Sequence, residues 1–220
     1  MRAHVTLTDP HAGQRVIRGG VSLPTARIVA ILLHGRGASP EAMLELAAEF
    51  GVPDVAYLAP AAADRSWYPR SFLAPLDQNE PWLGSALNSI NQLVATTVEQ
   101  GVPRDRIAIL GFSQGACLAL EFAARHAQRY AAVVGLSGGV IGPPETPRAY
   151  TGSFERTPVF LGCSDVDPHI PRSRVDETAD VLSRLGAAVE ERIYPGMGHT
   201  VNADEILAVR DLLSMSGSSE

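Results

Sequence analysis

Short apolar runs alternate along this chain with longer segments in which apolar residues recur at helical spacing. Residues 27–33 (RIVAILL) form the clearest run. Its uninterrupted apolar character is typical of a strand that is buried on both faces of a sheet. Similar runs predict further strands at residues 55–58, 106–110, 131–136, 158–161 and 188–194.

Helical spacing and end signals predict helices between these strands, at residues 39–50, 83–100, 114–127, 173–185 and 202–214. In the second of them, apolar residues from Leu83 to Val98 recur every three or four positions and give the helix one apolar face. Gly186 is suited to end the fourth helix, because glycine accepts the left-handed backbone that often follows a helix. Asn202 and Glu205 have the spacing of a capping box, which favours a helix start.

Strands that alternate with helices predict an α/β fold, with a mostly parallel sheet and helices on both of its faces. Residues 1–19 are expected to add one or two antiparallel edge strands. Residues 216–220 form a polar tail that is expected to be mobile. The sequence contains no internal repeat and no linker rich in glycine or serine, so residues 1–220 are expected to form a single domain.

Composition narrows the possible partners. The net charge is −6 and no basic run stands out, which argues against nucleic acid or an anionic membrane surface as a partner. No apolar run is long enough for a bilayer span, and residues 1–10 lack the apolar core of a signal peptide. The two cysteines, Cys117 and Cys163, favour buried thiols in a reducing compartment. We therefore expect a cytoplasmic protein without stable membrane insertion.

The most specific local signal is Gly-Phe-Ser-Gln-Gly at residues 111–115, between a predicted strand and a predicted helix. This context is the one required by a nucleophile elbow, a sharp turn that exposes a serine hydroxyl above the sheet. The glycines remove the Cβ atoms that would collide in so tight a turn. Ser113 is therefore the candidate nucleophile.

A serine hydroxyl needs a base, and the base needs an orienting acid. On an α/β-hydrolase sheet the three residues follow in the order Ser, Asp, His. Of the six histidines, only His169 and His199 lie far enough beyond Ser113. His169 lies in the loop that supplies the acid candidates, whereas His199 ends a glycine-rich loop after the last strand, so His199 is the candidate base.

The acid is expected after the strand at residues 158–161, where Asp165 and Asp167 both stand. Asp167 is favoured, because the following Pro168 restricts its backbone and stiffens the loop. Asp165 would then cap the loop or support its neighbour.

Two backbone N–H groups are expected to form an oxyanion hole, the site that stabilises negative charge on the attacked carbonyl oxygen. One belongs to Gln114, the residue after the nucleophile. The other is expected in the loop at residues 33–37 (LHGRG), where Arg36 is the favoured donor. The neighbouring His34 is interpreted as structural.

Taken together, these motifs resemble the phospholipase/carboxylesterase family of α/β-hydrolases, which includes bacterial carboxylesterases and acyl-protein thioesterases. The resemblance runs from about residue 27 to the last helix, and the segments that carry it are residues 33–37, 111–115, 136–138, 165–171 and 196–199. It implies the α/β-hydrolase fold, a triad of Ser113, Asp167 and His199, and hydrolysis of esters or thioesters without a cofactor or metal. The family often has an apolar residue in place of Arg36 and a His-Gly pair in place of Cys163 and Ser164.

The expected activity is that of a serine carboxylesterase acting on short to medium acyl esters through an acyl-enzyme. Thioesters and lysophospholipids are further possible substrates. A serine peptidase or amidase on the same fold is the alternative. A dienelactone-hydrolase-type enzyme fits less well, since Ser113 stands where those enzymes usually carry cysteine. A binding protein that has kept the fold without catalysis fits least, since no triad member is missing.

The substrate pocket is the least determined part of the sequence. Only a short loop separates residues 137 and 158, which leaves no room for a large helical lid. Aromatic residues concentrate further upstream, so Trp67, Phe72, Leu73 and Trp82 are the candidate pocket wall. The same residues are equally compatible with a small core under a long loop.

An apolar rim near Phe72 and Trp82 would suit a dimer, and the sequence does not decide between a monomer and a homodimer.

Overall fold

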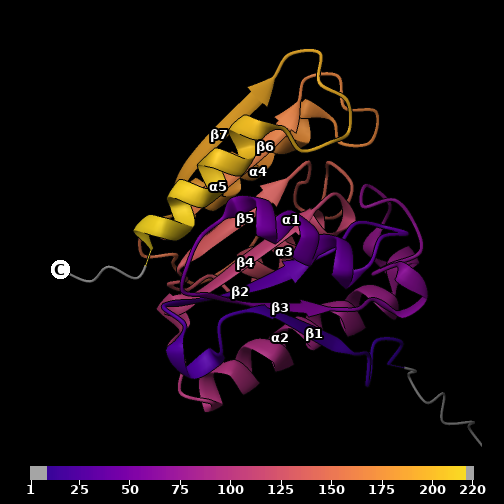
Figure 1. Cartoon of the computed structure of the whole chain (residues 1–220). Helices are drawn as coiled ribbons and strands as arrows, with labels where there is room; N and C mark the ends of the chain where they lie inside the picture. Colours follow the sequence, from indigo (N-terminus) through magenta and orange to yellow (C-terminus); the bar gives the residue numbers. More distant parts are fainter. Residues whose placement is uncertain (1–8, 217–220) are drawn as a thin grey trace, which may run out of the picture.

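The structure, a computed structural model, describes residues 9–216 of the 220. A seven-stranded sheet forms its centre (Figure 1). Its strands are β1 (Val16–Gly20), β2 (Ile28–Leu33), β3 (Val55–Pro60), β4 (Ile107–Phe112), β5 (Ala132–Leu136), β6 (Pro158–Ser164) and β7 (Ala188–Tyr194). Their order across the sheet is β1-β3-β2-β4-β5-β6-β7. β1 pairs antiparallel with β3, and the other neighbouring pairs are parallel.

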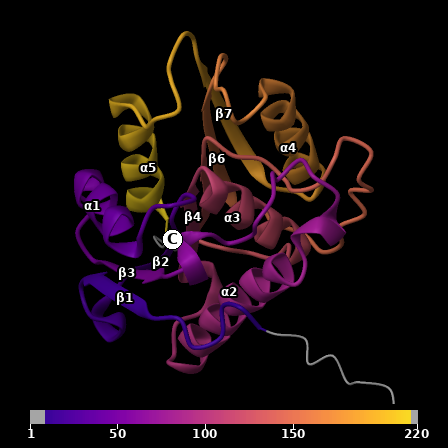
Figure 2. The ribbon, with the colours of Figure 1, turned by 90° about the vertical axis from the view of Figure 1, so that its right-hand side faces the viewer.

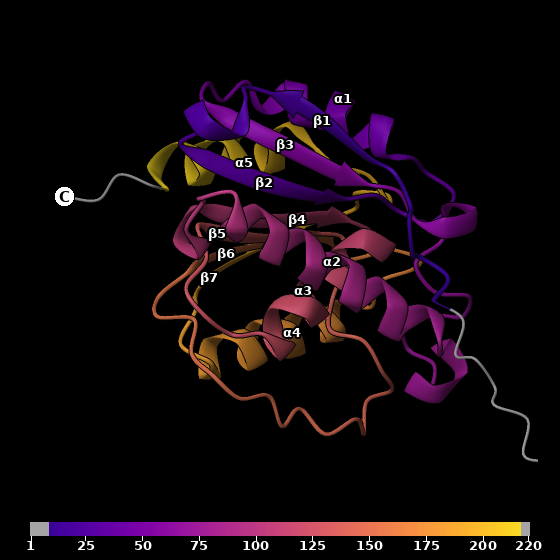
Figure 3. The same ribbon diagram turned by 90° about the horizontal axis from the view of Figure 1, so that it is seen from below.

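Five α-helices cover the two faces of this sheet. They are α1 (Pro40–Phe50), α2 (Trp82–Glu99), α3 (Gln114–Arg125), α4 (Arg172–Arg184) and α5 (Ala203–Met215). Figure 3 shows α1 and α5 on one face and α2, α3 and α4 on the other, and Figure 2 shows the same division from the side. The α/β fold with helices on both faces is therefore confirmed.

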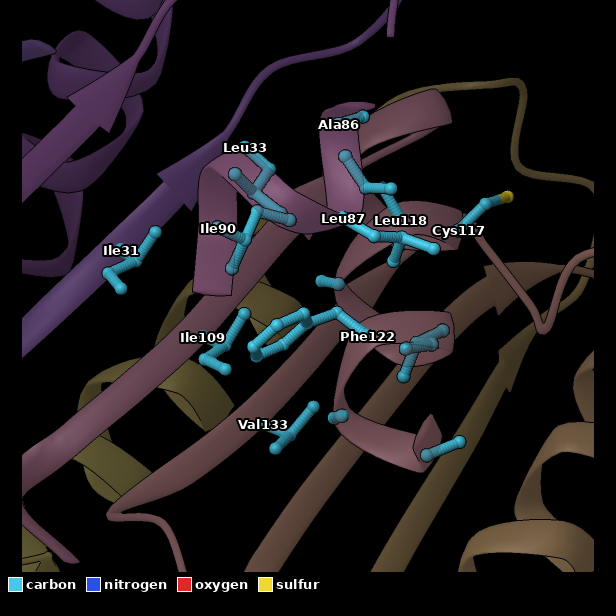
Figure 4. Close-up of a cluster of buried hydrophobic side chains, with 14 of the residues drawn as sticks. Ile31, Leu33, Ala86, Leu87, Ile90, Ile109, Cys117, Leu118, Phe122 and Val133 are labelled. Atoms are coloured by element: carbon cyan, nitrogen blue, oxygen red, sulfur yellow. The ribbon is translucent and has the colours of Figure 1, made fainter. Parts of the chain in front are cut away.

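Each face has its own hydrophobic core, because successive residues of a strand point to opposite sides. In β2, Ile31 and Leu33 belong to the core under α2, α3 and α4, whereas Ala30 and Leu32 belong to the core under α1 and α5. Figure 4 shows the first of these cores, in which Phe122 of α3 lies over Ile109 and Val133 of the sheet. The two-sided burial explains why β2 is apolar at every position.

Most predicted elements match the structure, with differences at their ends. The strand predicted from residue 106 begins at Ile107, because a short 3-10 helix (Arg104–Arg106) precedes it. Gly186 follows α4 with a φ of 84°, and Asn202 and Glu205 form the predicted capping box of α5. The other 3-10 helices, which were not predicted, are Leu23–Thr25, Ala63–Arg65 and Leu76–Asn79.

The two ends of the chain are only partly described. Of the one or two edge strands expected in residues 1–19, the structure contains β1, and residues 1–8 lie outside the described residues. Ser216, the first residue of the expected mobile tail, is instead buried and donates hydrogen bonds from Oγ to the carbonyls of Ala131 and Leu212. Residues 217–220 also lie outside the described residues.

The loop from β5 to β6 contains no helix, so no large lid lies over the sheet there. None of the helices formed by residues 9–216 combines the length and apolarity needed to cross a membrane.

Candidate active site

Ser113 occupies the turn between β4 and α3, at the carboxyl end of a central strand. Its φ of 55° and ψ of −119° lie outside the regions that residues with a side chain usually adopt. The strained residue is held by two backbone hydrogen bonds. Its N–H donates to the Leu136 carbonyl at 2.9 Å, and its own carbonyl accepts from the Cys117 N–H at 3.0 Å. This is the strain expected of a nucleophile elbow.

The glycines on either side of Ser113 are required by close backbone contacts. A Cβ atom on Gly111 would lie 2.2 Å from the Gly115 carbonyl oxygen. A Cβ atom on Gly115 would lie 2.0 Å from the Leu33 carbonyl oxygen in β2. No side chain fits at these distances, so α3 reaches the sheet closely only because both positions are glycine.

The structure brings Ser113, His199 and Asp167 together in one hydrogen-bonded row. His199 Nε2 lies 2.8 Å from Ser113 Oγ, and His199 Nδ1 lies 2.7 Å from Asp167 Oδ2. Ser113 follows β4, Asp167 lies in the loop after β6, and His199 lies in the loop after β7. Because these strands are parallel, all three residues lie at the carboxyl ends of the strands, on the same edge of the sheet. The geometry is that of a nucleophile, a base and an orienting acid.

The carboxylate of Asp167 is fully enclosed and well supplied with donors. Its Oδ1 accepts from the backbone N–H groups of His169 at 2.8 Å and Ile170 at 3.0 Å. Burial raises the pKa of Asp167, but the hydrogen bonds from His199 and the two N–H groups outweigh this effect and hold the pKa below its usual value. An ionised Asp167 favours the proton on His199 Nδ1, which leaves Nε2 free to accept the proton of Ser113.

Asp165, the other candidate acid, has a different contact. Its Oδ1 accepts from the Gly196 N–H at 2.8 Å. It thereby links the loop after β6 to the loop that carries His199. The structure therefore places Asp167, and not Asp165, beside the imidazole.

The two predicted oxyanion donors are the backbone N–H groups of Arg36 and Gln114. Gln114 is the first residue of α3, where an N–H has no acceptor within the helix. Among residues 9–216, neither of the two N–H groups has a hydrogen-bond partner. Gln114 also uses its side chain, which the sequence did not predict. Its Oε1 accepts from the Trp67 N–H at 2.9 Å and its Nε2 donates to the Tyr68 carbonyl at 2.8 Å.

Two buried histidines fix the loop that follows β3. His34 Nδ1 donates to the Gly35 carbonyl and Nε2 accepts from the Ala62 N–H. His11 accepts at Nδ1 from the Ala63 N–H and lies 3.0 Å from the Trp67 carbonyl at Nε2. Burial lowers the pKa of both imidazoles, which keeps them in the neutral form that these contacts need. The contacts of His34 support the structural role expected from the sequence.

A cavity of about 470 Å³ opens beside Ser113 and His199. Of the four candidate wall residues, only Phe72 lines it. The buried part of the lining also includes Tyr68, Cys117 and Ile170, and the exposed part includes Arg36, Arg70 and His169.

The assignment of Trp67, Leu73 and Trp82 to the pocket wall is wrong, because each packs elsewhere. The Trp67 indole N–H donates to the His34 carbonyl at 2.8 Å, and the ring is 1 % exposed. Trp82 presents its ring edge-on to His11, and Leu73 packs against the core under α2. Their apolar character fits a core as well as a pocket, so residue type alone could not separate the two environments.

His169 contacts the candidate base although it is not the base itself. Its ring lies 4.8 Å from that of His199 in an edge-to-face arrangement. Within residues 9–216, no group of three or more His, Cys, Asp or Glu side chains is placed to hold a metal ion. The hydrogen-bonded row of Ser113, His199 and Asp167 suits nucleophilic acyl transfer with a serine and a general base.

A serine on a strand–turn–helix elbow, with an aspartate and a histidine following on later parallel strands, defines an α/β-hydrolase. The fold is the α/β-hydrolase fold in a small form without a large lid. A sequence profile of the Phospholipase/Carboxylesterase family matches residues 22–216, and the chain belongs to this family. The resemblance found in the sequence motifs is thereby confirmed.

Similar proteins include bacterial carboxylesterases and fungal thioesterases. The crystal structure of a phospholipase/carboxylesterase from Dyadobacter fermentans is 40 % identical, with a TM-score of 0.88, and the match covers 91 % of this chain and 96 % of that one. Acyl-protein thioesterase 1 from Neurospora crassa is 29 % identical over 56 % of this chain, and the Saccharomyces cerevisiae protein of that name is 29 % identical over 61 %. The matches span 51 % and 60 % of these two relatives. The Bacillus cereus carboxylesterase, at 18 % identity and a TM-score of 0.73, shares the fold.

Proposed function

We propose that this protein is a serine carboxylesterase that hydrolyses short to medium acyl esters through an acyl-enzyme. The observation that carries the proposal is the row of hydrogen bonds from Asp167 through His199 to Ser113, at 2.7 and 2.8 Å. It lies at a cavity of about 470 Å³, a volume within the usual range for small ligands. Family membership supports hydrolysis of this kind.

The reaction proceeds in two acyl transfers. His199 Nε2 takes the proton of Ser113 as Oγ attacks the substrate carbonyl, and the N–H groups of Arg36 and Gln114 stabilise the resulting oxyanion. His199 then gives this proton to the departing alcohol, which leaves Ser113 acylated. In the second transfer His199 deprotonates a water molecule, the water attacks the acyl carbonyl, and the acid leaves as Ser113 regains its proton. Asp167 orients the imidazole and stabilises its charged form throughout.

Thioesters are a second substrate class within this proposal, because the same intermediates arise when a thiol leaves. The names of the fungal relatives support them. A serine amidase or peptidase remains the alternative reaction, since the row of Ser113, His199 and Asp167 serves either leaving group. A panel of matched ester, thioester and amide substrates separates these activities by their kcat/KM values.

The central test is the Ser113→Ala variant, assayed with 4-nitrophenyl butyrate and with a fluorophosphonate probe. We expect turnover to fall by about 10⁵-fold or more and labelling to be lost, because the attacking oxygen is removed. Ser89→Ala, on α2, is the matched control and should keep both. Circular dichroism confirms that each variant is folded. A folded Ser113→Ala protein that keeps most of its turnover would refute the proposal.

A further inference from the structure

The exposed side of the active-site cavity is positively charged, although the chain as a whole carries a net charge of −6. Arg36 and Arg70 line it together with His169 and His199, and no Asp or Glu among the described residues does so. The nearby carboxylate of Asp167 is turned inward, and its side chain has no exposed surface. The positive charge at the opening is therefore local and not a reflection of composition.

The Arg36 side chain is held in place without being neutralised. Its Nη1 donates to the Pro69 carbonyl at 3.0 Å and its Nη2 to the Arg70 carbonyl at 2.7 Å. Both partners are uncharged, so the guanidinium keeps its full charge and its remaining N–H groups. Among residues 9–216, neither Arg36 nor Arg70 forms an ion pair. A guanidinium that is fixed, exposed and unpaired is suited to bind a carboxylate.

The buried side of the cavity has the opposite character. Tyr68, Phe72, Cys117 and Ile170 are each less than a tenth exposed. Burial raises the pKa of the Cys117 thiol to about 12, so the thiol is neutral at physiological pH. One cavity beside Ser113 thus combines a buried apolar wall with an exposed cationic opening.

We infer that the preferred substrates are anionic esters, with an apolar part against the buried wall and a carboxylate bound by Arg36 and Arg70. This inference rests on the proposed esterase activity and specifies its substrate class. The carboxylate can belong to the acyl group, as in a half-ester of a dicarboxylic acid, or to the leaving group. In both cases the arginines recognise the same chemistry.

The test compares kcat/KM for two matched pairs of substrates. The acyl-group pair is the 4-nitrophenyl monoester of adipic acid and 4-nitrophenyl hexanoate, which have equal chain length. The leaving-group pair is the butyrate ester of 4-hydroxybenzoate and that of 4-hydroxybenzamide. The rate of enzyme-free hydrolysis is subtracted from each measured rate. Each kcat/KM is then divided by the enzyme-free rate constant of the same ester, which removes differences in intrinsic reactivity. We expect the anionic member of at least one pair to be preferred by about threefold to thirtyfold, the effect of two exposed ion pairs.

Variants show whether the arginines cause the preference. Arg70→Gln, alone and combined with Arg36→Gln, should lower kcat/KM for the preferred anionic ester and raise its KM. With the neutral partner, Arg70→Gln should change kcat/KM by a smaller factor than with the anionic ester. Arg104→Gln is the matched control, because it removes the same charge at the opposite end of β4. The preference should also shrink as salt rises from about 20 to about 500 mM, since exposed charges are screened.

The outcomes separate this inference from the proposed function. If neutral esters are hydrolysed and Ser113 is labelled but neither anionic ester is preferred, the inference is wrong and the esterase proposal stands. A preference that survives the double variant also overturns it. If no ester is hydrolysed and Ser113 is not labelled, the proposed function itself has failed.

Discussion

The two aspartates after β6 show how neighbouring residues of one type acquire different roles. Asp167 accepts a hydrogen bond from His199 Nδ1, whereas Asp165 accepts from the backbone of Gly196. In Asp167→Asn the amide can place its own N–H toward the imidazole and favour the wrong tautomer. We expect kcat to fall by about 10³- to 10⁴-fold with the fold intact.

Asp165→Asn is the control for this prediction, since an asparagine oxygen still accepts the Gly196 N–H. Its kcat with 4-nitrophenyl butyrate should stay within about tenfold of the parent value. A larger loss in Asp165→Asn than in Asp167→Asn would reverse the assignment of the acid.

The role of a single residue was predictable from the sequence where it depends on the order of residues along the chain and on a local motif. Ser113 has a glycine two residues away on each side, His199 directly follows a glycine, and both come after predicted strands, so their positions were predictable from the chain. Trp67 was misjudged because its partner, the His34 carbonyl, lies 33 residues away. The contribution of the Gln114 side chain was missed for the same reason, since it contacts a segment 46 to 48 residues distant.

Among the elements, α3 depends on its close approach to β2. The Cβ atom in Gly115→Ala would lie 2.0 Å from the Leu33 carbonyl oxygen, which belongs to the backbone and cannot rotate away. We expect a loss of about 3 kcal/mol or more in the free energy of unfolding, measured by urea denaturation, together with loss of activity as the elbow shifts.

Gly198→Ala, in the loop between β7 and α5, is the control for Gly115→Ala. A Cβ atom there meets no atom within 4 Å, and the φ of Gly198 is not in the left-handed region. Its free energy of unfolding should stay within about 0.5 kcal/mol of the parent. Equal losses in the two variants would show that the close contact at Gly115 is not what makes that glycine necessary.

The strands and helices were more predictable than the segments between them. β2 and β4 are buried on both faces, so their apolar runs were unmistakable, and the capping box of α5 is a local signal. The loop after β3 takes its shape from His11, His34 and Gln114, which come from three different parts of the chain. Its contacts cannot be inferred from local sequence, and it carries much of the cavity wall.

For the whole molecule, buried titratable groups give stability two opposing dependences on pH. Burial lowers the pKa of His11 and His34, so the unfolded chain binds their protons more readily. Their contribution is complete above the unfolded pKa of about 6.5 and is lost as pH falls below it.

Glu205 changes the stability with pH in the opposite direction. Burial, and secondarily the charge of Asp204, raises the pKa of Glu205 to about 7, although its hydrogen bond from Asn202 lowers it.

The Glu205 carboxyl therefore favours folding most at low pH, below its unfolded pKa of about 4.5. This contribution declines as pH rises through that value toward 7, where the buried group becomes charged. Its Oε2 accepts the Asn202 N–H, and its Oε1 is buried against Gly162 without a partner among the described residues. Glu205→Gln keeps an acceptor for the capping box and cannot become charged. We compare the free energy of unfolding of Glu205→Gln with that of the parent. From pH 5 to pH 8 we expect the difference to rise by about 1–3 kcal/mol in favour of the variant.

Urea denaturation of both proteins at the two pH values measures this gain. The histidine contributions are common to the two proteins and cancel in the difference, which isolates Glu205. Glu99→Gln, at an exposed position on α2, removes the same charge without burial and should show no such change. Equal stability differences between Glu205→Gln and the parent at pH 5 and pH 8 would mean that Glu205 is already ionised in the folded protein at pH 5, so that folding does not raise its pKa.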